Sequence, residues 1–114
     1  MLKISEKTVD NLVVLSLEGK LSGLENRGQI QDRVRDLTSK KKNRIIINLS
    51  QIKWIDSTGL GELISSLSTA KKHGGNLVLA NIPDPIKSLL KMTNLEQIFD
   101  TYESVERALH EMKG

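Results

Sequence analysis

KWIDSTGLGELISSL, residues 53–67, contains the change from a strand pattern to a helix pattern on which the fold prediction depends. The β-branched and aromatic residues before Asp56 are typical of a strand. From Leu60 onward, apolar residues recur at the spacing of one helix face, up to Ala70. We therefore expect a strand to become a helix here, with an acid and two hydroxyl side chains held at the junction.

The segments on either side of this stretch predict a parallel strand pair. Residues 44–50, RIIINLS, are apolar on both faces, as expected for a central strand covered by other elements. The helix of residues 60–70 is expected to end at Gly74 and Gly75, and NLVLANI, residues 76–82, is the next buried strand. A strand, a helix and a second strand imply a right-handed parallel crossover.

The N-terminal part predicts a hairpin followed by a helix. LKISEKTV and LVVLSLEG are separated by Asp10 and Asn11, a dipeptide that tolerates the positive φ of a tight hairpin turn. Ser22 and Glu25 have the spacing of a capping box, which predicts a helix from there to about Lys41. Gly28 would then lie inside that helix and weaken it.

The C-terminal part predicts two further helices. Asp84 and Pro85 form an N-cap and N1 pair, and an apolar face from Val105 to Met112 follows a cap near Ser104. Ile98 and Phe99 form an apolar patch between them. The predicted fold is an α/β domain with a mixed β-sheet of about four to five strands and about four helices, in a single domain over residues 1–114.

Composition excludes several classes of function. The chain has no cysteine, so disulfides and thiolate metal sites are excluded, and no apolar run is long enough for membrane insertion. Net charge is +3, and the cations collect in residues 40–44 and 71–73, where we expect solvated helix ends rather than a nucleic-acid surface. A cytoplasmic protein is the expectation.

The junction itself permits two interpretations. Unpaired N–H groups and the helix dipole favour an anion at a helix start, so a phosphoryl group on Ser57 or Thr58 would be well accommodated. Gly59 and Gly61 would keep the turn bare for another surface. Alternatively, Ser57 or Thr58 is only an N-cap and Asp56 only complements the dipole.

Catalytic interpretations of this junction are weaker. A nucleophile elbow requires glycine where Ile55 stands, and a phosphate-binding loop requires lysine where Leu60 or Glu62 stands. His73 is 16 residues beyond Ser57, roughly 24 Å along a helix axis, although this spacing does not exclude His110. DSTG matches the aspartic protease motif only if a residue is deleted, and it occurs once. We predict no enzyme, no metal and no cofactor.

The whole pattern resembles the STAS domain of bacterial anti-sigma factor antagonists. The resemblance rests on INLSQIKWIDSTGLGELISSLSTAKKHGGNLVLANI, on VVLSLEGKLS before it and on IKSLLKMTNLEQIFDTYESVERAL after it. In that family an anti-sigma factor serine kinase phosphorylates the serine after the aspartate, here Ser57, and a serine phosphatase reverses the modification. The resemblance implies that the unphosphorylated protein binds the anti-sigma factor and frees a sigma factor.

Two positions depart from the family pattern. Many members have aspartate where this chain has Asn48 and where Ser22 stands, and both positions are expected at the same sheet edge as Ser57. Similar domains also occur in stress-sensing assemblies, transporter tails and lipid-transport complexes. The alternative function is therefore that of a component of a stress-sensing assembly or of a lipid-transport or transporter complex. The predicted partner-binding residues are Asp56, Ser57, Thr58, Gly59, Leu60, Gly61, Ser22 and Asn48.

Trp54 also has two interpretations. It is either an exposed anchor for a partner beside Ser57 or a core residue alternating with Ile55, and we expect the core position because large aromatic residues are mostly buried. Met92, Leu95 and Met112 are expected to pack in the interior in the same way.

Overall fold

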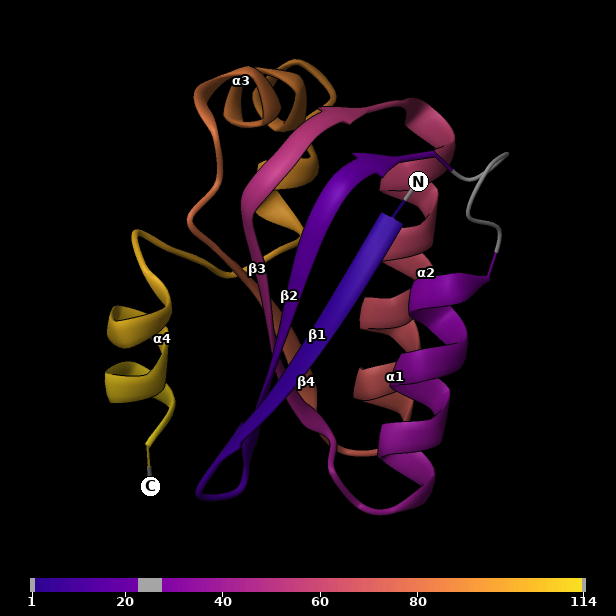
Figure 1. Ribbon diagram of the computed structural model, residues 1–114, viewed down its shortest axis with the longest axis vertical. Helices are drawn as coiled ribbons and strands as arrows, with labels where there is room; N and C mark the ends of the chain where they lie inside the picture. Colours follow the sequence, from indigo (N-terminus) through magenta and orange to yellow (C-terminus); the bar gives the residue numbers. More distant parts are fainter. Residues whose placement is uncertain (1, 23–27, 114) are drawn as a thin grey trace.

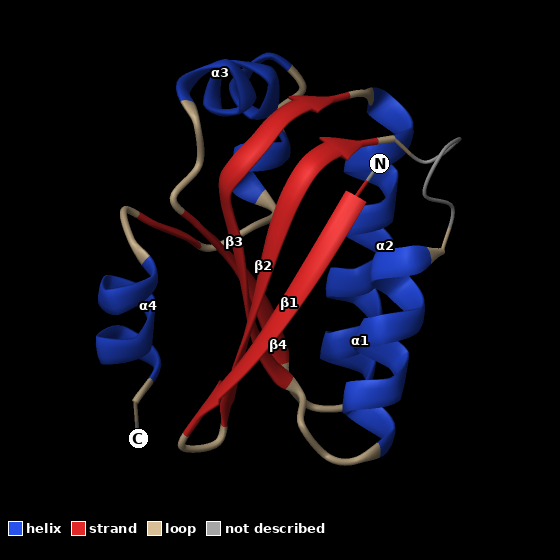
Figure 2. Ribbon diagram, viewed as in Figure 1, coloured by secondary structure: helices blue, strands red, loops and turns tan. Residues whose placement is uncertain are grey.

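The computed structural model describes residues 2–22 and 28–113 and contains one mixed sheet in the order β1-β2-β3-β4-β5. β1 and β2 are antiparallel, and the other neighbouring strands are parallel. Figure 1 and Figure 2 show α1 and α2 on one face of the sheet and α4 on the other, with α3 at one end. The bounds are β1 Leu2–Val9, β2 Leu12–Leu21, α1 Gln29–Ser39, β3 Arg44–Ile55, α2 Ser57–Lys72, β4 Asn76–Ala80, α3 Asp84–Met92, the 3-10 turn η1 Leu95–Gln97, β5 Thr101–Tyr102 and α4 Val105–Met112.

This architecture confirms the predicted fold class and most of its turns. Asp10 has φ of 56°, and Val9 pairs with Leu12 across the hairpin. The β3-α2-β4 unit is the expected parallel crossover. Ser104 caps α4 by accepting a hydrogen bond from the backbone N–H of Arg107 at 3.0 Å.

Two apolar clusters cover the two faces of the sheet. The larger cluster joins the inner faces of β1 to β4 to α1, α2 and α3, with side chains such as Leu15, Ile47 and Leu63 fully buried. The smaller cluster lies under α4 and consists of Leu12, Val14, Ile46, Val78, Ala80, Ala108 and Met112. β3 contributes only Ile46 to this second cluster, so α4 covers the part of the outer face nearest the hairpin.

The prediction for the start of the first helix is wrong. α1 begins at Gln29, and Gly28 is its N-cap with φ of 76°, a left-handed conformation that favours glycine. Gly28 is therefore a boundary residue rather than a weak point inside the helix. Ser22 follows β2 and does not cap α1, and Glu25, the other half of the predicted capping box, lies outside the described residues.

Two predictions of burial are also wrong. Trp54 is 49% exposed and Met92, at the end of α3, is 80% exposed. Trp54 alternates with Ile55, and because Ile55 takes the inner face, the indole points to the outer face beyond the reach of α4. Met112 is buried and Leu95 packs partly against the core, as expected, whereas Ile98 is exposed beside the buried Phe99.

The remaining boundary differences are small. α3 begins at Asp84 with Pro83 as its cap, one residue earlier than the predicted cap at Asp84. Among the described residues, no helix combines the length and apolar character needed to cross a membrane.

Candidate functional site

Asp56 organises the start of α2. Its backbone is extended, with φ of −113° and ψ of −179°, which is the conformation of an N-cap. Oδ1 accepts a hydrogen bond from the backbone N–H of Gly59 at 2.7 Å and another from the Thr58 hydroxyl at 2.6 Å. Asp56 is thus the cap itself, rather than a charge placed beside a serine cap.

Ser22 joins the end of β2 to this cap. Its Oγ donates a hydrogen bond to Oδ2 of Asp56 at 2.9 Å, and the backbone N–H of Asp56 donates to the Leu21 carbonyl at 3.3 Å. Ser22 is only 5% exposed. The expectation that Ser22 lies at the same sheet edge as the α2 start is therefore confirmed, and its hydroxyl fixes the orientation of the Asp56 carboxylate.

Ser57 and Thr58 form the exposed part of the turn. Both are exposed, and Ser57 is the first residue of a 16-residue helix. The hydroxyl of Thr58 is engaged by Asp56 in this arrangement. The Ser57 side chain therefore stands at the positive end of the α2 dipole, with an ordered acidic cap immediately before it.

Gly59 and Leu60 do not lie on the surface that was predicted for them. Leu60 is 3% exposed and belongs to the larger core cluster, because it begins the apolar face of α2. Gly59 is buried against β2, where an added Cβ would lie 2.3 Å from the Leu21 carbonyl oxygen. An added Cβ on Gly61, in contrast, would meet nothing within 4 Å, so Gly61 is the glycine that leaves the turn open.

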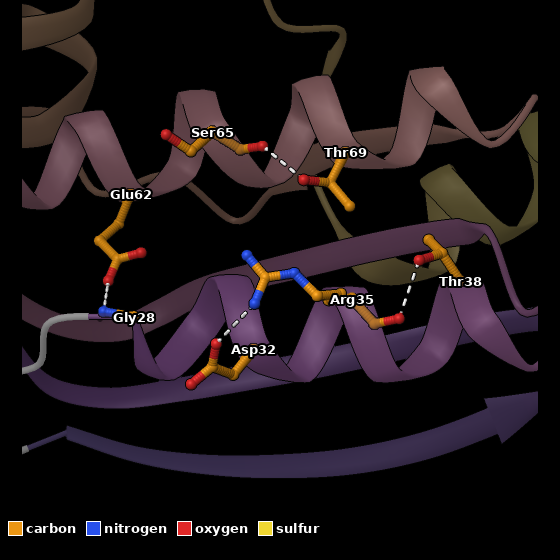
Figure 3. A network of polar contacts seen from close by, with 7 residues as sticks. All are labelled: Gly28, Asp32, Arg35, Thr38, Glu62, Ser65 and Thr69. Atoms are coloured by element: carbon orange, nitrogen blue, oxygen red, sulfur yellow. Dashed lines mark hydrogen bonds and ion pairs between the residues drawn. The ribbon is translucent and has the colours of Figure 1, made fainter.

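Glu62 is a structural residue that the sequence pattern did not reveal. It is 8% exposed, and Oε1 accepts a hydrogen bond from the backbone N–H of Gly28. Figure 3 shows the Glu62 side chain reaching from α2 to the start of α1. The available signal was a charged residue between Leu60 and Leu63, on a helix side that faces another helix. Glu62 ties α1 to the same end of α2 that carries Ser57.

Asn48 belongs to a different polar cluster. Its amide donates to the Ser16 hydroxyl at 3.2 Å, and its Oδ1 accepts from the Asn81 side chain and from the Ser50 backbone, both at 3.1 Å. These bonds link β2, β3 and the end of β4. Asn48 lies eight residues before Asp56 on β3, and its side chain bonds to Ser16, Ser50 and Asn81 rather than to the α2 cap. The prediction that Asn48 lies beside Ser57 is therefore wrong.

His110 is placed away from Ser57. It lines a hollow of about 560 Å³ between the β1–β2 hairpin and the end of α4, together with Asp10, Asn11 and Lys113. That hollow is at the start of β2, whereas Ser22 and the α2 cap are at the other end of this ten-residue strand, roughly 30 Å away. The geometry excludes a His110–Ser57 pair.

We also looked for side chains that could bind a metal ion in the part of the chain that the structure describes. Over residues 2–22 and 28–113, no group of three or more His, Asp or Glu side chains is placed to hold a metal ion. The chemistry available at the α2 start is that of an exposed hydroxyl, a capped helix terminus and a carboxylate held by hydrogen bonds.

Known proteins resemble the chain along most of its length. The family model described as the STAS domain matches residues 3–108. A Thermotoga maritima protein provisionally named an anti-sigma factor antagonist is 30% identical, over 94% of this chain and 95% of its own length. The Bacillus subtilis anti-sigma-B factor antagonist is 37% identical over 47% of this chain and 50% of its own length.

Solved structures agree with these sequence similarities. The crystal structure of the Thermotoga maritima anti-sigma factor antagonist, so named provisionally, superposes with a TM-score of 0.88 at 28% identity, covering 97% of this chain and 95% of that one. The unphosphorylated form of the antagonist SpoIIAA superposes with a TM-score of 0.75 at 20% identity, covering 98% and 99% of the two chains. The second similarity supports the fold alone.

Proposed function

The chain belongs to the STAS domain family, among the anti-sigma factor antagonists, and we propose that it is a protein-binding module switched by phosphorylation of Ser57. In the unphosphorylated state it binds an anti-sigma factor that is also a serine kinase, and so releases a sigma factor in the cytoplasm. A serine phosphatase restores this state after phosphorylation. The observation that carries the proposal is an exposed Ser57 hydroxyl directly after the hydrogen-bonded Asp56 cap.

The geometry of the turn favours modification at Ser57 over its neighbour. A kinase needs an accessible hydroxyl on a defined backbone, and Ser57 is exposed on a helix start that Asp56 and Ser22 hold in place. Thr58 is also exposed, but its hydroxyl donates to Asp56 at 2.6 Å. Phosphorylation of Thr58 would remove that bond and bring a dianion against the capping carboxylate.

The proposed switch acts by charge and leaves the fold intact. Phosphoserine adds about 1.5 to 2 negative charges, and the dipole of α2 offsets part of that charge locally. A partner surface covering Ser57 would have to desolvate the dianion or face it with carboxylates, and an uncompensated buried charge costs several kcal/mol. The phosphorylated protein is therefore excluded from the complex.

The site of modification can be tested directly. Tagged wild-type protein is used as bait in a native cell lysate, and the recovered anti-sigma factor is then incubated with the pure protein and Mg-ATP. We expect the wild type to gain one phosphate by intact-mass spectrometry, because Ser57 is the presented hydroxyl. Ser57→Ala should gain none, and the matched variant Thr58→Ala should still gain one.

Two outcomes would contradict the assignment. Phosphate mapped to Thr58 or Ser65 in the wild type would reject Ser57 as the acceptor. Recovery of a transporter ATPase or a large sensory assembly, without an ATP-binding anti-sigma factor, would favour the alternative role of the domain.

A further inference from the structure

Trp54 is an exposed aromatic residue beside the proposed switch. It is the single tryptophan of the chain, it is 49% exposed, and it stands two residues before Asp56. Neighbouring apolar residues of β3 are buried, with Ile52 at 3% and Ile55 at 8% exposure. Leaving half of this large indole exposed to water is unfavourable, because burial of apolar surface stabilises a protein by about 25 cal/mol per Å².

The local strand geometry holds the indole outward. β2 and β3 pair irregularly here, because Gly19 lies opposite Ile52 while the next residue, Lys20, lies opposite Trp54. Lys53 is the extra residue in this irregularity, and after it Ile55 takes the inner face. Such irregularities redirect side chains at the ends of strands. The exposed position of Trp54 therefore follows from the backbone pairing rather than from a loose side chain.

The exposed charged side chains nearest Trp54 in the strands are cationic. Lys20 is in register with it on β2, Lys53 precedes it, and both are exposed. The nearest exposed carboxylate along β2 is Glu18, which pairs with Gln51 instead. Asp56 is half-buried, and both of its oxygens accept hydrogen bonds. Trp54 thus has an exposed lysine opposite it on β2 and another before it on β3, and it stands three residues before the exposed Ser57.

We propose that Trp54, Lys20 and Lys53, named here the tryptophan anchor, determine which anti-sigma factor the protein binds. The indole inserts into an apolar pocket of that factor, and the two lysines face carboxylates at the pocket rim. This inference rests on the proposed function and identifies the chemistry of the partner surface. Tryptophan is enriched among the few residues that dominate binding energy, and opposite charges around such a residue set orientation and association rate.

The tryptophan anchor would also increase the difference in partner affinity between the unphosphorylated and the phosphorylated protein. An acidic rim that suits Lys20 and Lys53 would be brought close to Ser57, three residues beyond Trp54 on the same chain. A phosphoryl dianion there meets like charge as well as a desolvation cost, and close like charges at an interface cost several kcal/mol. The same partner carboxylates would therefore favour the unmodified protein and reject the phosphorylated one.

The single tryptophan allows the contact to be observed without ambiguity. The protein is labelled with 5-fluorotryptophan, which gives one ¹⁹F resonance, and is titrated with the unlabelled anti-sigma factor recovered by the wild-type bait. We expect the resonance to shift on binding and to lose most of its H₂O/D₂O solvent isotope shift, because the indole leaves water. Without partner, the resonance should not change with protein concentration.

The energetic contribution is measured by isothermal titration with variants. Trp54→Ala should weaken binding at least about thirtyfold, which corresponds to about 2 kcal/mol, and Trp54→Phe should retain most of the affinity. The double variant Lys20→Glu and Lys53→Glu should weaken binding at least about tenfold. The matched double variant Lys41→Glu and Lys42→Glu, before the other end of β3, should bind like wild type.

The outcomes separate this inference from the proposed function. If wild type binds and both Trp54→Ala and the Lys20/Lys53 variant bind equally well, the tryptophan anchor is rejected while the proposed function stands. If wild type binds no anti-sigma factor, both are rejected. A ¹⁹F shift that depends on protein concentration alone would assign the surface to a second copy of this chain and overturn the inference.

Thermal melts of each variant exclude unfolding as the cause of weaker binding. If Trp54→Ala does not fold, the double variant Lys20→Glu and Lys53→Glu provides the test.

Discussion

Asp56 shows how one residue can serve both the fold and the site. Its carboxylate accepts from the Gly59 N–H, from Thr58 and from Ser22, so it closes the start of α2 and joins it to β2. The same bonds hold the backbone that presents Ser57. The stability of the junction and the presentation of the hydroxyl are therefore coupled through a single side chain.

Removal of this cap should be measurable as a loss of stability. Asp56→Ala leaves the Gly59 N–H and the Ser22 hydroxyl without their acceptor, and loss of an N-cap costs about 0.5–2 kcal/mol. We expect a lower urea midpoint with an unchanged slope. The matched variant Ser104→Ala removes the side-chain cap of α4, whose Oγ accepts from the Arg107 N–H. Ser104→Ala should lose a similar amount of stability but still bind the partner, whereas Asp56→Ala should lose both stability and partner binding. An Asp56→Ala protein as stable as wild type would refute the capping role.

Residue patterns predicted local features better than tertiary ones. Asp10 in the hairpin and Ser104 at α4 were predictable because short-range backbone chemistry determines them. The exposure of Trp54 depends on how far α4 extends and on an irregular pairing with β2, neither of which leaves a periodic signal. The bonds of Asn48 to Ser16 and Asn81 likewise depend on strand order.

At the scale of elements, the close approach of α2 to β2 positions the site. Gly59 permits this approach, because any larger residue would place its Cβ 2.3 Å from the Leu21 carbonyl oxygen. The fold was predictable here as a strand followed by a helix, yet the sequence pattern did not indicate which glycine faced inward. Gly59 and Gly61 are two residues apart on one helix and have opposite surroundings.

The two glycines therefore provide a matched comparison. Gly59→Ala should destabilise the protein by about 1–3 kcal/mol, because the backbone of β2 cannot give way as a flexible side chain would. Gly61→Ala meets open space and should be neutral or stabilising by up to about 1 kcal/mol, since alanine favours the helix. Chemical denaturation measures both. Equal effects of the two substitutions would contradict the described packing of α2 on β2.

At the scale of the whole molecule, the charge distribution agrees with protein binding. The basic cluster at residues 40–44 takes part in structural contacts, since Lys40 pairs with Asp36 at 3.3 Å and Arg44 donates to the Met112 carbonyl. These contacts tie the cluster to the end of α1 and to the end of α4. Lys20 and Lys53 instead stand exposed beside the proposed switch, at the opposite end of β3.

The position of Ser57 at the start of α2 confines the effect of a phosphoryl charge to the surface around that turn. Ser57 is the first residue of α2. The turn around it is held by the hydrogen bond from the Gly59 N–H to Asp56, and the first turns of α1 and α2 are joined by the hydrogen bond from the Gly28 N–H to Glu62. A dianion added to the exposed Ser57 faces solvent and the positive end of the α2 dipole rather than the core. We therefore expect phosphorylation to change what the surface can bind while α2 remains folded.

The central claim is that phosphorylation of Ser57 excludes the partner without refolding the protein, and isothermal titration with the nucleotide-loaded anti-sigma factor tests it most directly. We predict that the Ser57-phosphorylated protein and Ser57→Asp bind at least about tenfold more weakly than wild type, a difference of about 1.4 kcal/mol, while Ser57→Ala still binds. The far-UV circular dichroism of all four proteins should be the same. Equal affinity of the phosphorylated and unphosphorylated proteins would contradict the switch, and weaker binding accompanied by loss of helix signal would contradict its electrostatic origin.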